Sequence, residues 1–232
     1  MNNVYEEMVD NTCKEYLDHG SAGTVHDLGN GTCCKKIFNK EYVNTKDQRK
    51  VLETIKDLRL HNFCQLIKIY YNSLGQVDGY TMKKYQSDPV NILKMPKDYI
   101  IDSYKSLYAS MLILADNYIS VSDLKASNTF TTYNGIIVFD YDLYSIKDSK
   151  ESARIINIAK LNCLFNELLK RELLVNYHSV YESKYEEMID KLFNAGTTID
   201  TIEKALSKCN RIVEYIRGAN GFGRRYYWSY KR

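Results

Sequence analysis

The sequence has little of several features that mark common protein classes. Only two of its 232 residues are proline, Pro89 and Pro96. No apolar run reaches the roughly 18 residues that a membrane-spanning helix requires. The first ten residues, MNNVYEEMVD, are too acidic and polar for a secretion signal. We therefore expect a cytoplasmic protein without a membrane partner.

An excess of charge of one sign is also missing. The chain has 32 lysine and arginine residues against 29 aspartate and glutamate residues, which gives a net charge of +3. This small excess does not favour nucleic acid as a partner of the protein body. The tail RRYYWSYKR, residues 224–232, has side chains that can stack on bases. We expect its aromatic residues to dock on the helical part of the chain instead.

The cysteines do not form a metal-binding pattern. No two of them have C-x-x-C spacing, and no histidine cluster lies near them, so a zinc site is not expected. Free thiols in a reducing compartment are the interpretation we favour. The six residues are Cys13, Cys33, Cys34, Cys64, Cys163 and Cys209.

Residues 1–85 predict a small sheet of about five strands with one helix. Residues 25–28 and 32–38 are two strands of a hairpin, and Asn-Gly in the connection GNG predicts a two-residue turn. The segment 45–60 has apolar residues at helical spacing. Two further strands are predicted in CQLIKIYYN, residues 64–72, and GYTMKKY, residues 79–85.

The rest of the chain is predicted to be mainly helical. A long amphipathic helix is expected at 97–117, and further helices at about 150–173, 179–194 and 198–217. Between the first two lies VSDLKASNTFTTYNGIIVFDYD, residues 121–142. This segment contains an Asn134-Gly135 turn and an apolar strand at 136–139.

Polar side chains are concentrated at both ends of that hairpin. Asp123, Lys125 and Asn128 form the pattern D-x-K-x-x-N, and Asp140 ends the apolar strand. Carboxylate and amide oxygens are suitable Mg²⁺ ligands, and a nearby lysine can stabilise a transferring phosphoryl group. These residue types are also common in ordinary turns. The pattern alone therefore leaves both interpretations open.

A glycine-rich corner and a lysine occur in the first half. LDHGSAGTV, residues 17–25, contains Gly20 and Gly23, and Lys35 lies in the second strand of the predicted hairpin. Glycine allows backbone amides to approach a phosphate closely. A lysine on the adjacent strand can reach the α- and β-phosphates of a nucleotide.

The order and spacing of these pieces resemble the protein-kinase family over residues 15–145. LDHGSAGTV is similar to its glycine-rich loop, TCCKKIF to its lysine strand and GYTMKKY to the strand before its hinge. SVSDLKASN is similar to its catalytic loop and VFDYD to its D-F-G segment. The resemblance implies an α+β, bilobal fold. Residues 1–85 would form an antiparallel five-stranded N-lobe with one helix, and residues 86–232 a reduced, mainly helical C-lobe.

The resemblance also implies ATP and Mg²⁺ as cofactors and assigns a role to each site residue. Asp123 would accept or orient the proton of the substrate hydroxyl, and Lys125 would neutralise the transferring phosphoryl group. Asn128 and Asp140 would hold magnesium. The nucleotide-binding residues would be Gly20, Ser21, Gly23, Val25, Cys33, Lys35, Glu53 and Met82.

The acid that pairs with Lys35 stays open. Glu53 is the only glutamate in the predicted helix 45–60, but the spacing places the expected position nearer Val51. Two residues correspond to about 200° around a helix. Asp47 is the alternative partner.

Several positions depart from the family pattern. Asp18 replaces the first glycine of the loop, and Val121 and Ser122 replace the His-Arg pair before Asp123. Tyr141 and Asp142 replace the Phe-Gly of D-F-G, and Asp142 would either help to bind metal or face solvent. No proline follows Asp142, so the A-P-E motif is absent from the sequence.

Three functions follow as hypotheses. The first is an ATP-dependent phosphotransferase with a Ser/Thr protein substrate. The second is a pseudokinase that acts as a binding or regulatory module with a protein partner, which the altered motifs and short second half favour. The third is a small-molecule kinase, although Lys125 is more typical of the protein-kinase pattern.

Overall fold

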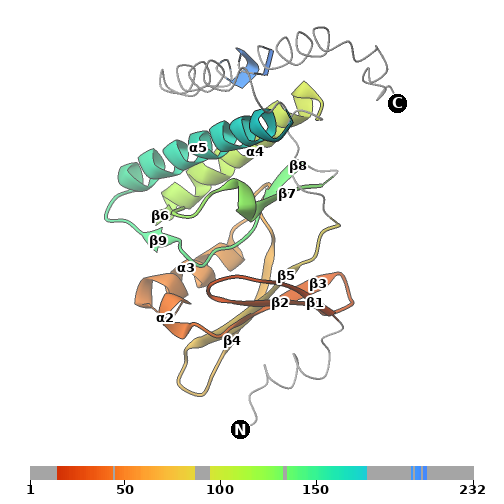
Figure 1. The fold of residues 1–232 in the computed structure, drawn as a ribbon. Coiled ribbons are helices and arrows are strands. Elements are labelled where there is room, and N and C mark those ends of the chain that lie inside the picture. The colour runs from red at the N-terminus through yellow and green to blue at the C-terminus, as the bar shows by residue number, and fades with distance from the viewer. Residues whose placement is uncertain are drawn as a thin grey trace.

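The computed structural model describes residues 15–43, 45–86, 95–132, 135–176, 200, 202–204 and 206–207. Within them the chain has an α+β fold with a five-stranded antiparallel sheet, two long helices and two small two-stranded sheets (Figure 1). The α+β class and the five-stranded antiparallel sheet predicted from the sequence are therefore confirmed.

The sheet aligns three residues that matter for the site. Its strands are β1 (Glu15–His19), β2 (Gly23–Asp27), β3 (Thr32–Ile37), β4 (Leu66–Tyr71) and β5 (Val77–Lys83), in the order β1-β2-β3-β5-β4. Lys35 of β3 pairs with Val25 of β2 on one side and with Tyr80 of β5 on the other. These residues form one row across the middle of the sheet.

The connection between β2 and β3 differs from the predicted two-residue turn. It contains four residues, 28–31, and the positive φ angles belong to Gly29 (73°) and Gly31 (78°) rather than to Asn30. The Asn30 side chain instead accepts a hydrogen bond from the Thr32 amide at 3.1 Å. The hairpin is confirmed, but its turn is longer because two glycines take the left-handed conformations.

Two helices connect β3 to β4. They are α2 (Lys40–Val43), which the sequence did not predict, and α3 (Lys46–Asp57). Thr45 caps α3 by accepting a hydrogen bond from the Gln48 amide at 3.2 Å. The helix ends at Asp57, before the predicted end at residue 60, and its buried face contains Val51, Leu52 and Ile55.

The long helices α4 (Lys97–Asp116) and α5 (Lys150–Asn176) lie side by side (Figure 1). The Tyr104 ring of α4 packs edge-on against Phe165 of α5, with 5.1 Å between ring centroids. The Tyr104 hydroxyl donates to Asn162 Oδ1 at 3.0 Å. The helices predicted at 97–117 and about 150–173 are confirmed.

The two small sheets lie between the five-stranded sheet and the helices α4 and α5 (Figure 1). One pairs β6 (Ile119–Ser120) with β9 (Ser145–Ile146). The other pairs β7 (Thr129–Thr132), which follows the short 3₁₀ helix η2 (Ala126–Asn128), with β8 (Gly135–Val138). The predicted strand at 136–139 corresponds to β8, while Asn134 of the predicted turn lies outside the described residues.

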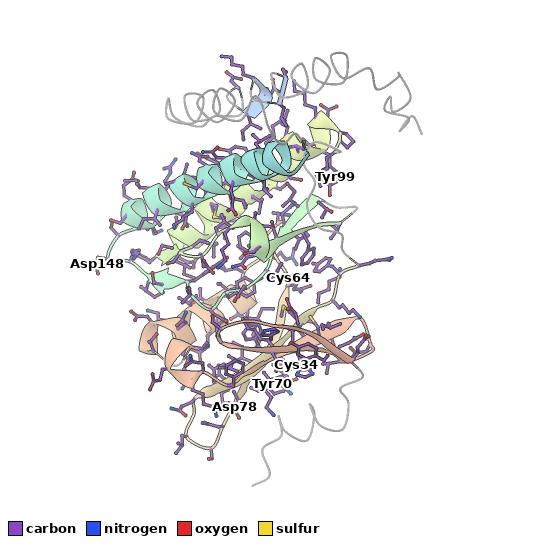
Figure 2. All side chains as sticks on the ribbon, in the orientation of Figure 1. Cys34, Cys64, Tyr70, Asp78, Tyr99 and Asp148 are labelled. Atoms are coloured by element: carbon purple, nitrogen blue, oxygen red, sulfur yellow. The ribbon has the colours of Figure 1, made fainter. Side chains whose placement is uncertain are left out.

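A short segment before β4 joins the sheet to β8. The Val138 amide donates to Asn62 O and the Cys64 amide donates to Val138 O, both at 2.8 Å. Cys64 lies between the five-stranded sheet and the small sheets (Figure 2). These bonds fix the position of the chain segment that follows β8, which contributes to the candidate site.

Other expectations fall on parts that the structure does not describe. The predicted helix at 179–194, the tail 224–232 and Pro89 lie outside the described residues. Of the helix predicted at 198–217, residues 200, 202–204 and 206–207 are described, and they are helical. Among all described residues, no helix combines the length and the apolarity that a membrane crossing needs.

Candidate functional site

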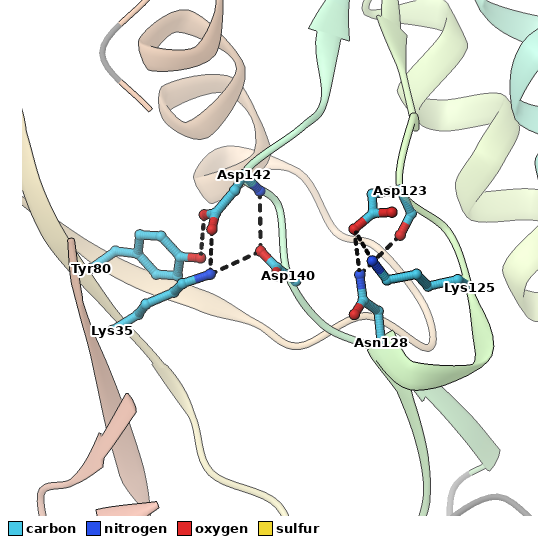
Figure 3. Close-up of polar contacts among 7 residues, drawn as sticks. All are labelled: Lys35, Tyr80, Asp123, Lys125, Asn128, Asp140 and Asp142. Atoms are coloured by element: carbon cyan, nitrogen blue, oxygen red, sulfur yellow. Dashed lines mark hydrogen bonds and ion pairs between the residues drawn. The ribbon is translucent and has the colours of Figure 1, made fainter. Parts of the chain in front are cut away.

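Lys35 lies at the centre of a buried polar cluster. Its Nζ donates to Asp140 Oδ1 at 3.0 Å and to Asp142 Oδ2, and the Tyr80 hydroxyl donates to Asp142 Oδ1 at 3.1 Å (Figure 3). The exposed fractions of Lys35 and Asp142 are both 5%. We call these four residues the Lys35 cluster. It joins strands β3 and β5 to the segment after β8.

The segment 139–142 is held in place by its backbone and by Tyr141. The Phe139 amide donates to Asn128 O at 3.0 Å, and the Asp142 amide donates to Asp140 Oδ1 at 3.2 Å. Tyr141 is fully buried, and its hydroxyl donates a hydrogen bond to Cys64 O. Asp140 adopts a left-handed φ of 73°, which is uncommon outside glycine. This backbone turn directs both carboxylates towards Lys35.

One ammonium group is shared by two carboxylates, and the pKa values reflect this. Burial opposes the charge on Lys35, but the charges of Asp142 and Asp140 outweigh it and raise the lysine pKa. Burial also opposes ionisation of Asp140, yet the Lys35 charge lowers the pKa of that carboxyl. Burial raises the pKa of Asp142 to about 6, with Lys35 acting against the shift and Asp140 adding to it. With all three groups ionised, the cluster has an uncompensated negative charge.

A second cluster contains the D-x-K-x-x-N residues. Asn128 Nδ2 donates to the Asp123 backbone oxygen and to Asp123 Oδ2, both at 3.0 Å, and Lys125 Nζ lies 2.8 Å from Asp123 Oδ2 (Figure 3). Asn128 is buried, whereas Lys125 is exposed. We call these residues the Asp123 cluster. The Phe139–Asn128 backbone bond links it to the Lys35 cluster.

Two residues of helix α5 support the loop that contains the Asp123 cluster. Asn157 Oδ1 accepts from the Val121 amide at 2.8 Å, and Asn157 Nδ2 donates to Ile119 O at 3.0 Å. Glu167 Oε2 accepts from the Ala126 amide at 3.0 Å. The loop between β6 and η2 is therefore bonded to α5 before and after Asp123.

A buried hydroxyl near both clusters lacks a partner. Tyr144 is 2% exposed, and its Oη has no hydrogen-bond partner among the described residues. Burial raises the pKa of Tyr144 well above its ordinary value, and the charges of Asp140 and Asp123 add to the shift. The hydroxyl is thus a free hydrogen-bond donor in the electric field of the two acids.

The structure brings together five of the predicted site residues in these two clusters. They are Lys35, Asp123, Lys125, Asn128 and Asp140. No group of three or more His, Cys, Asp or Glu side chains is arranged for metal binding in the part of the chain that the structure describes. A magnesium ion held here would take its few protein ligands from Asn128 and Asp140 and the remainder from phosphate or water.

The predicted nucleotide-binding residues of the sheet lie on β2, β3, β5 and the corner before β2. Val25 pairs with Lys35, and Cys33 pairs with Met82, whose carbonyl lies 3.8 Å from the Cys33 thiol. Burial raises the pKa of Cys33 to about 11, so this thiol stays protonated. Ser21 of the corner is exposed.

The two glycines of the corner differ in whether packing requires them. A Cβ on Gly23 would lie 2.1 Å from the Lys36 carbonyl oxygen, so strand packing requires glycine there. A Cβ on Gly20 would meet nothing within 4 Å. The Gly20 amide donates to Gly23 O at 2.9 Å and closes the corner. Packing within the described fold does not require glycine at position 20.

Neither acid that the sequence left open is the partner of Lys35. Glu53 accepts from Arg49 Nε and from the Tyr71 hydroxyl, both at 2.9 Å, and its side chain is 45% exposed. Asp47 is also exposed, and Lys35 pairs with Asp140 and Asp142 instead. The reason is the rotation of α3, which turns Val51 towards the core and Glu53 towards solvent.

Sequence reasoning missed the contributions of Tyr80, Tyr144 and Asn157. It also left open whether Asp142 faces solvent, and the structure shows that it does not. Tyr80 lies in the strand predicted at 79–85, but its place opposite Lys35 depends on the register between β3 and β5, which are not consecutive strands in the sequence. No local pattern marks Tyr144 or Asn157.

Comparison with known proteins adds no assignment. The chain matches no protein-family model, and no curated protein matches it.

Proposed function

We propose that this protein is an ATP-dependent phosphotransferase with a bilobal, protein-kinase-like fold. It transfers the γ-phosphate of Mg-ATP to a hydroxyl group. The observation that supports this most strongly is the contact between Lys35 and Asp140, which are 105 residues apart in the sequence. A cationic group and a candidate metal ligand thus meet beside the Asp123 cluster, as phosphoryl transfer requires.

The nucleotide would lie against the five-stranded sheet. Gly20 and Gly23 allow the corner between β1 and β2 to approach the phosphates, and Lys35 binds the α- and β-phosphates. The open space at Gly20 supports this role, since the fold itself places no demand for glycine there.

The residues present fit a magnesium ion. The Lys35 cluster has an uncompensated negative charge, and the Asp140 side chain is 28% exposed, so it remains accessible. The unpartnered Tyr144 hydroxyl can donate to an oxygen atom in the same region. Asn128 and Asp140 would hold the ion, which would neutralise charge on the phosphate oxygens.

The Asp123 cluster would act on the acceptor. Asn128 Nδ2 donates to the Asp123 carboxylate at 3.0 Å and orients it, and this carboxylate would accept the proton of the attacking hydroxyl. The Lys125 side chain is 48% exposed, and its ammonium would move from Asp123 to the transferring phosphoryl group. Catalysis would come from positioning and electrostatics, with no covalent intermediate on the protein.

We take a Ser or Thr hydroxyl of a protein as the acceptor. The support is Lys125, whose ammonium lies 2.8 Å from Asp123, since small-molecule kinases with related loops tend to lack this lysine. A pseudokinase would keep the clusters for binding alone, and the experiment below separates the two.

Thermal unfolding with and without Mg-ATP tests the binding step. Ligand at about 100 times its dissociation constant stabilises by roughly 2.7 kcal/mol, which for a chain of this size is a shift on the order of 5–10 °C. We expect this shift to require magnesium and to be lost in Asp140→Asn. The exposed Asp148 provides a control, and Asp148→Asn should retain the full shift. No shift at millimolar Mg-ATP would overturn the proposal.

Phosphate transfer to a panel of protein and peptide substrates tests the chemical step. We expect Asp123→Asn to retain the Mg-ATP shift while turnover falls by about 10²–10⁴-fold, the usual contribution of a positioned base. Binding without turnover in the wild type would instead identify a pseudokinase.

A further inference from the structure

We infer that Asp142, oriented by Tyr80, is the residue that positions Lys35 for phosphate binding. The inference deepens the proposed function and rests on it. The sequence had suggested an acid of helix α3 as the partner of Lys35, and the inference gives this role to the segment after β8.

Both oxygens of the Asp142 carboxylate have defined partners. Oδ2 accepts from Lys35 Nζ, and Oδ1 accepts from the Tyr80 hydroxyl at 3.1 Å (Figure 3). Tyr80 is fully buried, and Asp142 and Lys35 are each 5% exposed. A carboxylate held at both oxygens in a buried site cannot rotate away without leaving a buried polar group unpaired. Asp142 therefore restricts the Lys35 side chain to one position.

Asp140 contacts Lys35 as well, but its surroundings suit a different task. Its side chain is 28% exposed, compared with 6% for that of Asp142. When Asp140 turns towards a cation, Lys35 loses one of its two carboxylate partners. The Asp142 carboxylate can then keep the ammonium in place, because its bond from the Tyr80 hydroxyl does not involve Asp140. In this proposal Asp140 binds the cation, and Asp142 positions Lys35.

Helix α3 offers no competing partner. Glu53 is bound to Arg49 and Tyr71 at the surface, and the fully buried Val51 occupies the position that the spacing had indicated. The position of Lys35 is consequently set by its own strand, by β5 and by the segment 140–142. We expect substitution of Glu53 to leave nucleotide binding unchanged.

A double-mutant cycle measured by calorimetry with Mg-ATP tests the inference. The proteins are the wild type, Asp142→Asn, Lys35→Met, the double variant, and Glu53→Gln as the matched control. We expect Asp142→Asn to weaken binding at least tenfold and Glu53→Gln to change it less than twofold. In the Lys35→Met background, Asp142→Asn should change binding less than twofold, because its effect passes through Lys35.

The outcomes separate this inference from the proposed function. A wild type that binds no Mg-ATP overturns both. Three results with a wild type that binds Mg-ATP overturn the role of Asp142 alone. They are unchanged affinity in Asp142→Asn, an equal loss of affinity in Glu53→Gln, and additive effects of the two substitutions in the cycle. If Asp142→Asn does not fold, Tyr80→Phe replaces it, since this variant removes one hydroxyl and nothing else. Tyr80→Phe should weaken binding threefold or more, and an unchanged affinity would refute the inference.

Discussion

Asn157 gives the sharpest test of how the fold supports the candidate site. It is fully buried on α5 and makes three hydrogen bonds to backbone groups. Its amide donates to Met111 O at 3.1 Å and Ile119 O at 3.0 Å, and its carbonyl accepts from the Val121 amide at 2.8 Å. One side chain thus ties α4, β6 and the start of the Asp123 loop to α5.

Asn157→Ala removes all three bonds at a site that water does not reach. Each bond contributes about 1 kcal/mol net, and a buried donor left unpaired costs about 1–3 kcal/mol. We expect a loss of about 3–5 kcal/mol in the free energy of unfolding. For a chain of this length, that is a decrease in Tm on the order of 10 °C.

Urea unfolding of the wild type and two variants measures this. The control is Asn162→Ala on the same helix, where a half-buried side chain accepts one hydrogen bond from Tyr104. This control should cost only about 1 kcal/mol. The slope of free energy against urea should stay unchanged, so that the midpoints report stability. Equal losses in the two variants would refute the reasoning from burial and bond count.

Three further predictions concern the corner, the unpartnered hydroxyl and the thiols. Gly23→Ala should lower stability by about 1–3 kcal/mol because a Cβ meets a carbonyl at 2.1 Å, whereas Gly20→Ala should leave stability unchanged and weaken Mg-ATP binding. Equal stability of the two variants in urea would contradict this. Tyr144→Phe should raise the stability of the ligand-free protein by about 1 kcal/mol, since it removes a buried unpaired hydroxyl. A loss of stability would mean that the hydroxyl has a partner. Peptide mapping after native alkylation at pH 8 should find the exposed Cys163 modified and Cys33, whose pKa burial raises to about 11, protected. Early modification of Cys33 would show that β3 opens.

Much of the local structure could be predicted from the sequence because it is encoded in periodicity and composition. Helix α4 begins at Lys97 and ends at Asp116, close to the predicted 97–117, because its apolar residues recur at helical spacing. The strands predicted at 25–28, 32–38, 64–72 and 79–85 correspond to β2, β3, β4 and β5, whereas β1, which is exposed along its whole length, has no such pattern. The β2–β3 turn was predicted too short because Gly29 and Gly31, rather than Asn30, take the positive φ angles. Such a choice depends on how the two strands align.

Part of the candidate site could also be predicted from the sequence, and part could not. Asp123, Lys125 and Asn128 lie within six consecutive residues, and their spacing alone makes their contact predictable. The partner of Lys35 was not predictable, because the choice among acids depends on the rotation of a helix and on a backbone turn far along the chain.

The sequence by itself thus determined the strands β2 to β5 and β8, the helices α3, α4 and α5, and which polar residues gather at the hairpin after α4. Only the tertiary structure decided that Asp142 rather than Glu53 meets Lys35, and that Tyr80 fixes that carboxylate. The physical reason is the sequence separation over which each kind of interaction acts. Periodicity and turn chemistry act over a few neighbouring residues, whereas the Lys35–Asp142 pair spans 107 residues and forms only once the sheet and β8 have packed together.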